Sequence, residues 1–309
     1  MTPRVVLTGA TGFIGAAVLR QLAQQPVRVR VISRRDHPLP PEVEWVPADL
    51  AQPESLARVC SQADVLIHAA SHIGSDAEQC ARVNDHGTAA LMREAGRAGV
   101  GRIVQLSTTA VYGRGPHRGA AVGDLTPAPG SATSRTRLAA EAHALRHGAV
   151  VLRAGLVTGA GDRWVVPALA ELVQRLPGYW NGGRAMLSMI AVEDLARLIT
   201  QAALRIPVTV PGVHHAVHPA PVRLHDLLDA LAALALLPAV SGELMWEECT
   251  ARMTEHPGQV SERQLALLAF DHWYSGTAVW PAHACAPGPG PLARLADAAP
   301  WYRAHLAHT

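Results

Sequence analysis

A glycine-rich turn, Thr8-Gly9-Ala10-Thr11-Gly12-Phe13-Ile14-Gly15, lies near the start of this 309-residue chain. The apolar run Val5-Val6-Leu7 precedes the turn, and an apolar helical pattern begins near Phe13. In such a strand, turn and helix, one glycine permits the sharp turn and another lets backbone N–H groups approach a pyrophosphate, while Gly15 allows close helix packing. Glycines at this spacing also occur in simple tight turns, but here a strand pattern precedes the turn and a helical pattern follows it, as a dinucleotide site requires. The stretch predicts a dinucleotide site with contacts from Gly9, Thr11, Gly12, Phe13, Ile14 and Gly15.

Short β-branched runs alternate with longer Ala/Leu-rich stretches through the first half of the chain. This alternation predicts an α/β fold, a Rossmann-like, doubly wound parallel sheet with helices on both faces. The expected strands are residues 5–7, 29–32, 43–46, 65–67, 103–106 and 150–152, and the expected helices are about 16–24, 54–61, 78–98 and 135–147.

The alternation breaks down after about residue 155. We expect helices near 165–176, 192–204 and 224–236, and turns in the proline-rich stretches at 219–221 and 286–291. The sequence therefore predicts a dinucleotide-binding Rossmann domain at residues 1–160. The mixed region at residues 161–309 is expected to supply a smaller, partly helical substrate-binding cap and the closing helices.

The end of the second expected strand indicates which dinucleotide binds. An NAD site would place Asp or Glu there to accept from the ribose 2′-hydroxyl, whereas the 2′-phosphate of NADP requires a cation. Here the strand ends Ile32-Ser33-Arg34-Arg35. Because guanidinium groups form charge-assisted bonds to phosphate, Arg34 and Arg35 favour NADP(H). The alternative is a pair of solvated arginines.

The composition argues against several other classes of protein. Hydrophobic residues make up 49% of the chain and charged residues 17%, which suits one globular body with a substantial core. We expect a soluble cytoplasmic protein without a membrane partner, because the most apolar later stretch, 227–240, is too short to span a bilayer. A net charge of +2 without a basic stripe argues against nucleic acid. The four cysteines form no CxxC pair, which predicts reduced thiols and no metal site.

Lysine does not occur in this chain, so all 27 basic residues counted as Lys or Arg are arginine. No catalytic step can therefore depend on a lysine ammonium. Arginine remains charged at physiological pH, so it can hold an anion but cannot shuttle a proton.

Several further segments carry a family pattern. They are Ala48-Asp49-Leu50, His68-Ala69-Ala70, Val83-Asn84-Asp85-His86-Gly87-Thr88, Leu106-Ser107-Thr108-Thr109-Ala110-Val111-Tyr112-Gly113 and Val192-Glu193-Asp194-Leu195-Ala196. Together with the turn they resemble the extended short-chain dehydrogenase/reductase family, which contains nucleotide-sugar epimerases, dehydratases and related ketoreductases. The resemblance implies cofactor contacts at Asp49, Leu50, Ala69, Ala70, Ala154 and Val157, and it places Thr108 at the catalytic Ser/Thr position.

The chain departs from this family at the proton-transfer pair. The family uses a Tyr-x-x-x-Lys pair, and the run Ser134-Arg135-Thr136-Arg137-Leu138-Ala139-Ala140-Glu141 matches its register. Thr133 then occupies the Tyr position and Arg137 the Lys position. The pKa of a threonine hydroxyl is far too high for the Tyr role, although Arg137 can still hold the nicotinamide ribose. We expect Thr108, Thr133 and Arg137 to form the catalytic set.

Two features indicate the class of substrate. Leu156 occupies the position of an Asn that helps nucleotide-sugar enzymes of this family to bind the substrate diphosphate, and leucine offers no polar partner. Six of the seven tryptophans fall in the second half of the chain, where the cap is expected. Indole rings suit a flat, apolar or aromatic ligand, although they also fill the cores of small domains.

The sequence therefore predicts an NADPH-dependent ketoreductase that acts on an apolar, polycyclic aromatic polyketide ketone in antibiotic tailoring. One alternative is a non-catalytic NADP(H)-binding sensor, and another is a nucleotide-sugar epimerase or dehydratase with a degenerate site. Tyr112 and the histidines at 214, 215 and 218 are weak candidates for a replacement acid. Our hypothesis is that an acidic hydroxyl of the substrate supplies the proton. The sequence leaves the oligomeric state open.

Overall fold

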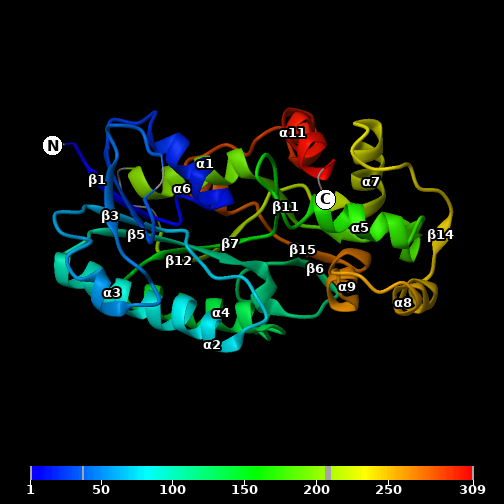
Figure 1. Ribbon diagram of the computed structural model, residues 1–309, viewed down its shortest axis with the longest axis horizontal. Coiled ribbons are helices and arrows are strands. Elements are labelled where there is room, and N and C mark those ends of the chain that lie inside the picture. Colours follow the sequence, from blue (N-terminus) through cyan, green and yellow to red (C-terminus); the bar gives the residue numbers. More distant parts are fainter. Residues whose placement is uncertain (1, 37, 206–209, 308–309) are drawn as a thin grey trace.

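The computed structural model describes residues 2–36, 38–205 and 210–307. Its body is a seven-stranded, entirely parallel sheet of order β12-β7-β5-β4-β1-β2-β3 (Figure 1). The strands are β1 (Arg4–Thr8), β2 (Arg28–Ser33), β3 (Glu44–Pro47), β4 (Val65–His68), β5 (Arg102–Thr108), β7 (Val150–Ala154) and β12 (Gly212–Ala216). The predicted doubly wound sheet is confirmed.

Helices cover both faces of this sheet. Figure 1 shows α1 (Phe13–Leu22) and α6 (Val192–Leu204) on one side, and α2 (Ala77–Cys80), α3 (Thr88–Ala98) and α4 (Ala132–Leu145) on the other. Two apolar clusters fill the layers between sheet and helices, one on each face. Because both faces are buried, the central strands β1 and β4 each contain a continuous apolar run, Val5-Val6-Leu7 and Val65-Leu66-Ile67.

Two of the expected helices differ in the structure. The helix expected at 54–61 is wrong: only the 3-10 turn η1 (Pro53–Leu56) forms, because Arg58 and Gln62 adopt positive φ angles of 64° and 60°. The stretch expected at 78–98 is helical, but the π-helical segment η2 (Ala81–Gly87) lies between α2 and α3. The other expected helices lie within three residues of their predicted ends.

The second half of the chain builds a separate apolar core from short strands and helices. A four-stranded sheet of order β13-β10-β15-β6 combines β6 (His117–Ala120), β10 (Met186–Leu187), β13 (Val222–Arg223) and β15 (His272–Tyr274). Two-stranded pairs join β8 (Leu156–Thr158) with β11 (Met189–Ala191) and β9 (Tyr179–Trp180) with β14 (Glu243–Leu244). The helices are α5 (Val166–Arg175), α7 (Leu224–Ala233), α8 (Trp246–Glu255), α9 (Glu262–Ala269), α10 (Val279–Ala282) and α11 (Pro291–Leu306).

This second core lies beyond one end of the large sheet, at the right of Figure 1. The large sheet nevertheless takes its edge strand β12 and its helix α6 from beyond residue 160, so the C-terminal region contributes to both cores. Cys60, Cys80, Cys249 and Cys285 are buried free thiols. No helix in the described ranges is both long enough and apolar enough to cross a membrane.

Candidate active site

The glycine-rich turn leaves room for a phosphate at the start of α1. Gly9 has a φ of +78°, and a Cβ there would lie 2.7 Å from the Ala70 backbone nitrogen. A Cβ at Gly15 would collide with the backbone of Gly9. Gly12 precedes α1 without a side-chain cap, and the first turn of that helix has no acidic residue. The first N–H groups of α1 are thus available to an anion, and the helix dipole favours its charge there.

A cavity of about 370 Å³, called the cofactor cavity below, extends from this turn across the carboxyl ends of the strands. Most of the cofactor contacts expected from the sequence line it. They are Gly9, Thr11, Gly12, Phe13, Ile14, Gly15, Arg34, Asp49, Leu50, Ala69, Ala70 and Arg137. Arg35 is exposed and does not line the cavity, while Ala154 and Val157 are buried in β7 and β8 outside its lining. An elongated dinucleotide with a pyrophosphate at the turn fits these residues.

Arg137 lines the cofactor cavity beside β5, whereas Arg34 lines it at the end of β2. Ser131 and Ser134 cap α4 reciprocally and fix where the helix begins, one turn before Arg137. The Nη2 group of Arg137 donates to the Leu106 carbonyl at 3.0 Å. Burial lowers the pKa of Arg137 to about 10, so the guanidinium stays charged at neutral pH. It can therefore hold a polar group of the cofactor.

His68, the last residue of β4, forms hydrogen bonds to β1 and α3. Its Nδ1 lies 2.7 Å from Thr8 Oγ1 and its Nε2 lies 2.9 Å from Thr88 Oγ1. Burial, and to a smaller extent the charge of Arg137, lowers the pKa of His68 to about 4. The imidazole is therefore neutral at physiological pH and acts as a bridge between β1 and α3.

The two threonines of the expected catalytic set differ in what their hydroxyls do. Thr108 is half-buried, and its Oγ1 accepts from the Ala110 N–H at 3.2 Å, while its own proton has no acceptor among the residues that the structure describes. Thr133 Oγ1 donates to the Gly74 carbonyl at 3.1 Å and accepts from the Gly74 N–H at 3.2 Å. Thr133 thus binds the loop after β4, and neither threonine lines the cofactor cavity.

A buried polar network lies behind β5. Arg153 donates to Glu141 at 2.6 Å and to the Tyr112 hydroxyl at 2.7 Å, and Glu141 also accepts from Ser107. The Tyr112 hydroxyl lies 2.7 Å from His215 Nε2. Because His215 Nδ1 can donate to a backbone carbonyl at 3.2 Å, its Nε2 accepts the Tyr112 proton.

This network shows that Tyr112 is not placed as a replacement acid. Tyr112 is 2% exposed, its proton goes to His215, and burial raises its pKa above the ordinary value. Burial also lowers the pKa of His215 to about 4, so that ring stays neutral. The contact of His215 with Tyr112 could not be predicted from the sequence, because it depends on β12 lying beside β7.

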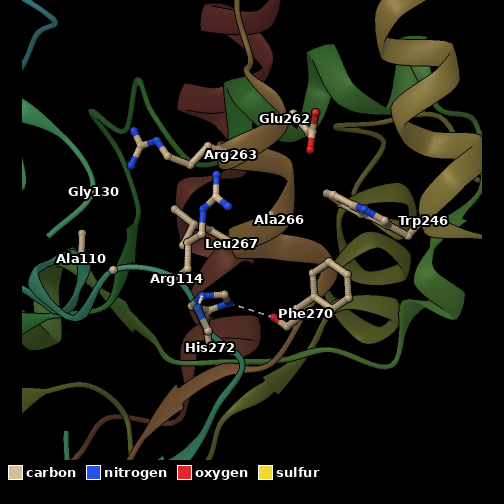
Figure 2. A pocket seen from close by; sticks show the side chains of 12 residues that line it. Ala110, Arg114, Gly130, Trp246, Glu262, Arg263, Ala266, Leu267, Phe270 and His272 are labelled. Carbon is tan, nitrogen blue, oxygen red and sulfur yellow. Dashed lines mark hydrogen bonds between the residues drawn. The ribbon is translucent and has the colours of Figure 1, made fainter. Parts of the chain in front are cut away.

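A second cavity of about 490 Å³ lies between the loop after β5 and the helices α8 and α9 (Figure 2). Trp246 and Phe270 form an edge-to-face pair in its lining, with ring centroids 4.9 Å apart. His272 donates from Nδ1 to the Phe270 carbonyl at 3.1 Å and accepts from a backbone N–H at Nε2. Ala110 and Gly130 also line the cavity, whereas Thr108 and Thr133, two residues before Ala110 and three residues after Gly130 in the chain, do not.

The tryptophans of the second half serve several purposes. Trp180 and Trp280 are completely buried and fill the cores, as the alternative interpretation of the sequence expects. Trp246 lines the second cavity, whereas Trp164 is 59% exposed and lines the cofactor cavity. Only some of the indoles are therefore available to a ligand.

The fold and the cofactor cavity define a Rossmann protein of the extended short-chain dehydrogenase/reductase type. The chain belongs to the NAD dependent epimerase/dehydratase family, whose pattern matches residues 5–212. This confirms the resemblance found in the sequence. The family depends on a nicotinamide dinucleotide.

Two curated relatives are named as reductases. A ceramide reductase of Caulobacter vibrioides is 34% identical over 214 residues, which cover 66% of this chain and 62% of that protein. A 4-hydroxy-2-methyl-3-oxo-4-farnesyl-3,4-dihydroquinoline-1-oxide ketoreductase of Stigmatella aurantiaca is 27% identical over 289 residues, which cover 86% of this chain and 83% of that protein. The chain thus spans less than two thirds of the ceramide reductase but most of the ketoreductase.

Solved structures share the whole fold. The UDP-glucuronic acid 4-epimerase of Bacillus cereus, in complex with UDP-glucuronic acid and NAD, matches with a TM-score of 0.76. The match covers 98% of this chain and 99% of that chain at 18% sequence identity. At this identity the likeness shows the fold alone.

Proposed function

We propose that the chain is an NADPH-dependent ketoreductase that reduces an apolar, polycyclic aromatic ketone, such as an aromatic polyketide in antibiotic tailoring. The observation that carries this proposal is the arrangement around Thr108. Its hydroxyl donates no hydrogen bond within the described ranges, and Ala110, two residues further along the chain, lines the aromatic second cavity. The reductase names of the two curated relatives support the reaction class, and one of those names specifies a ketoreductase.

NADPH is favoured over NADH by the adenosine end of the cofactor cavity. Arg34 is exposed and lines the cavity there, where it is available to a 2′-phosphate. The Ser33 hydroxyl accepts from Trp45 Nε1 at 2.9 Å and donates to the Arg35 carbonyl at 2.8 Å, which fixes the strand end that carries Arg34. We place the reaction in the cytoplasm, where NADPH is supplied.

The reaction requires a hydride, which bound NADPH supplies, and a proton. Thr108 donates a hydrogen bond to the ketone oxygen and stabilises the charge that develops there. Arg137 holds the nicotinamide ribose, and Thr133 holds the loop after β4 through Gly74. Because a threonine replaces the usual tyrosine, we assign the proton to an acidic hydroxyl next to the ketone on the substrate. That hydroxyl transfers its proton to the former carbonyl oxygen and regains one from water.

A panel of aromatic ketones tests this proposal. Each ketone is assayed for NADPH oxidation with its neighbouring hydroxyl free and with the same hydroxyl masked as a methyl ether. We expect turnover of the free compounds only, while the masked ketones still bind. Full activity on a masked ketone would contradict the assigned proton source, and turnover with NADH alone would contradict the cofactor.

The engagement of Thr133 by Gly74 favours one alternative, a non-catalytic NADP(H) sensor, because it leaves no acid at the position of the family tyrosine. A sensor binds NADP(H) but consumes none across the ketone panel. The other alternative, a degenerate nucleotide-sugar enzyme, has no polar side chain at Leu156 for a diphosphate. Binding of a nucleotide sugar to the protein loaded with NADP would favour it.

A further inference from the structure

Two arginines line the second cavity from different segments. Arg114 follows the 3-10 turn η3 (Thr109–Tyr112), and Arg263 lies in the first turn of α9. Both are exposed, and neither forms a hydrogen bond or ion pair with another residue in the described ranges. A Cβ built on Gly130 would lie 3.9 Å from Arg263 Nη1, so this guanidinium reaches across to the loop before α4. The two charges are therefore available to a ligand.

The carboxylate nearest in sequence does not neutralise these arginines. Glu262 also lines the cavity, but it forms no ion pair with either arginine in the described structure. Figure 2 shows the Glu262 and Arg263 side chains extending in opposite directions from α9. Some arginines of the C-terminal region are paired, such as Arg175 with Glu171 at 2.8 Å and Arg184 with Glu243 at 2.8 Å, whereas the exposed Arg163 and Arg223 have no ion pair in the described ranges and line neither cavity. The charged side chains of the lining are therefore two guanidinium groups and one carboxylate that does not pair with them, and their sum is a net charge of +1.

The rest of the lining is apolar and partly aromatic. Trp246 and Phe270 form one wall, and Ala266 and Leu267 contribute the surface of α9 between them and Arg114 (Figure 2). A flat ring packs favourably against such a wall, and an anion attached to the ring would meet the guanidinium groups.

We propose that the second cavity binds an anionic aromatic group, with the ring on the Trp246 and Phe270 wall and the anion on Arg114 and Arg263. The inference rests on the proposed function, because we take this group to be part of the ketone substrate that reaches Thr108. Two residues span at most about 7 Å, so Ala110 in the lining lies close enough to Thr108 for one polycyclic ligand to reach both. The substrate class is therefore a polycyclic aromatic ketone that carries an acidic group away from the carbonyl.

Calorimetric binding of two matched probes tests this site. The probes are 2-naphthoate and its neutral isostere 2-naphthamide, and the full chain is titrated with each in saturating NADP⁺ so that the cofactor cavity is filled. We expect 2-naphthoate to bind about tenfold more tightly, since two exposed ion pairs together contribute about that much. The preference should shrink as salt is raised, because exposed charges are screened.

Variants assign the preference to the two arginines. R114Q and R263Q should each reduce the preference, and the double variant should abolish it while the amide binds as before. R93Q, which removes an exposed arginine of α3 outside both cavities, is the matched control and should leave the preference intact. Equal affinity of the two probes for the unaltered protein would overturn the inference, as would a preference that survives in the double variant.

The binding assay involves no turnover, so the two proposals fail separately. If the protein prefers 2-naphthoate but reduces no ketone, the ketoreductase proposal is wrong and the anion site stands. If the protein reduces aromatic ketones but does not prefer 2-naphthoate, the anion site is wrong and the ketoreductase proposal stands.

Discussion

The cofactor cavity and the second cavity hold their charged groups in different ways. Arg137 in the cofactor cavity is bonded to the Leu106 carbonyl, and the Glu141–Arg153 pair behind it is almost completely buried. Arg114 and Arg263 in the second cavity are exposed and have no partner in the described protein. The difference indicates that the charge at the Arg137 end of the cofactor cavity is fixed before any ligand binds, whereas Arg114 and Arg263, like Arg34 at the adenosine end, keep their charge for a ligand.

The largest effect is expected from Glu141→Gln, which tests how rigid the cofactor side is. The change leaves the buried Arg153 guanidinium without a counter-charge, which should lower the free energy of unfolding by about 3–5 kcal/mol. Denaturant unfolding measures it. The control Glu243→Gln breaks an exposed pair with Arg184 and should cost less than about 1 kcal/mol. Equal losses in the two variants would contradict the contrast between buried and exposed charge.

The next effect concerns the glycine-rich turn. Gly9→Ala places a Cβ against the Ala70 backbone, so we expect NADPH affinity to fall about 100-fold, or about 2.7 kcal/mol, in a fluorescence titration. Gly99 has a similar φ of +70° but no atom within 4 Å of its would-be Cβ. Gly99→Ala should therefore cost about 1 kcal/mol of stability and leave the affinity unchanged. If both variants bound NADPH normally, the turn would not be the phosphate site.

The contrast between the cavities also explains what the sequence could predict. The turn is a local motif, and Arg137 follows from the register of one helix, so both were found at the cofactor cavity from sequence alone. The prediction of a helix at 54–61 was wrong because the periodic pattern does not show that Arg58 and Gln62 adopt positive φ angles. Such a deviation depends on tertiary packing around the turn rather than on the composition of the segment.

The polar network and the second cavity depend on contacts between distant segments. Tyr112 meets His215 only because β12 pairs with β7, more than 60 residues apart in the chain. The second cavity joins the loop after β5, the loop before α4, and the helices α8 and α9. Of its lining residues the sequence singled out Trp246, as a cap tryptophan, and Ala110 and Gly113, as parts of a family segment. Neither clue indicated that these segments meet.

A smaller effect distinguishes the two arginines at the end of β2. Arg34 lines the cofactor cavity and Arg35 does not, so Arg34→Gln should weaken NADPH binding about tenfold through loss of a charged phosphate contact. NADH binding should not change. Arg35→Gln is the matched control and should leave both affinities as they are. An NADPH preference that persists in R34Q would assign cofactor selection to another group.

The smallest effects are expected from substitutions of two tryptophans, one in the lining of each cavity. Trp246→Leu removes one ring of the pair with Phe270, so KM for aromatic ketones should rise about fivefold, since an aromatic pair contributes about 1 kcal/mol. NADPH affinity should be unaffected. Trp164→Leu, on the edge of the cofactor cavity, should do the reverse and weaken NADPH binding by a similar factor without changing KM for the ketone once the cofactor is saturating. If either variant altered both constants, the two cavities would act as one continuous site, and the ligand in the second would contact the cofactor directly.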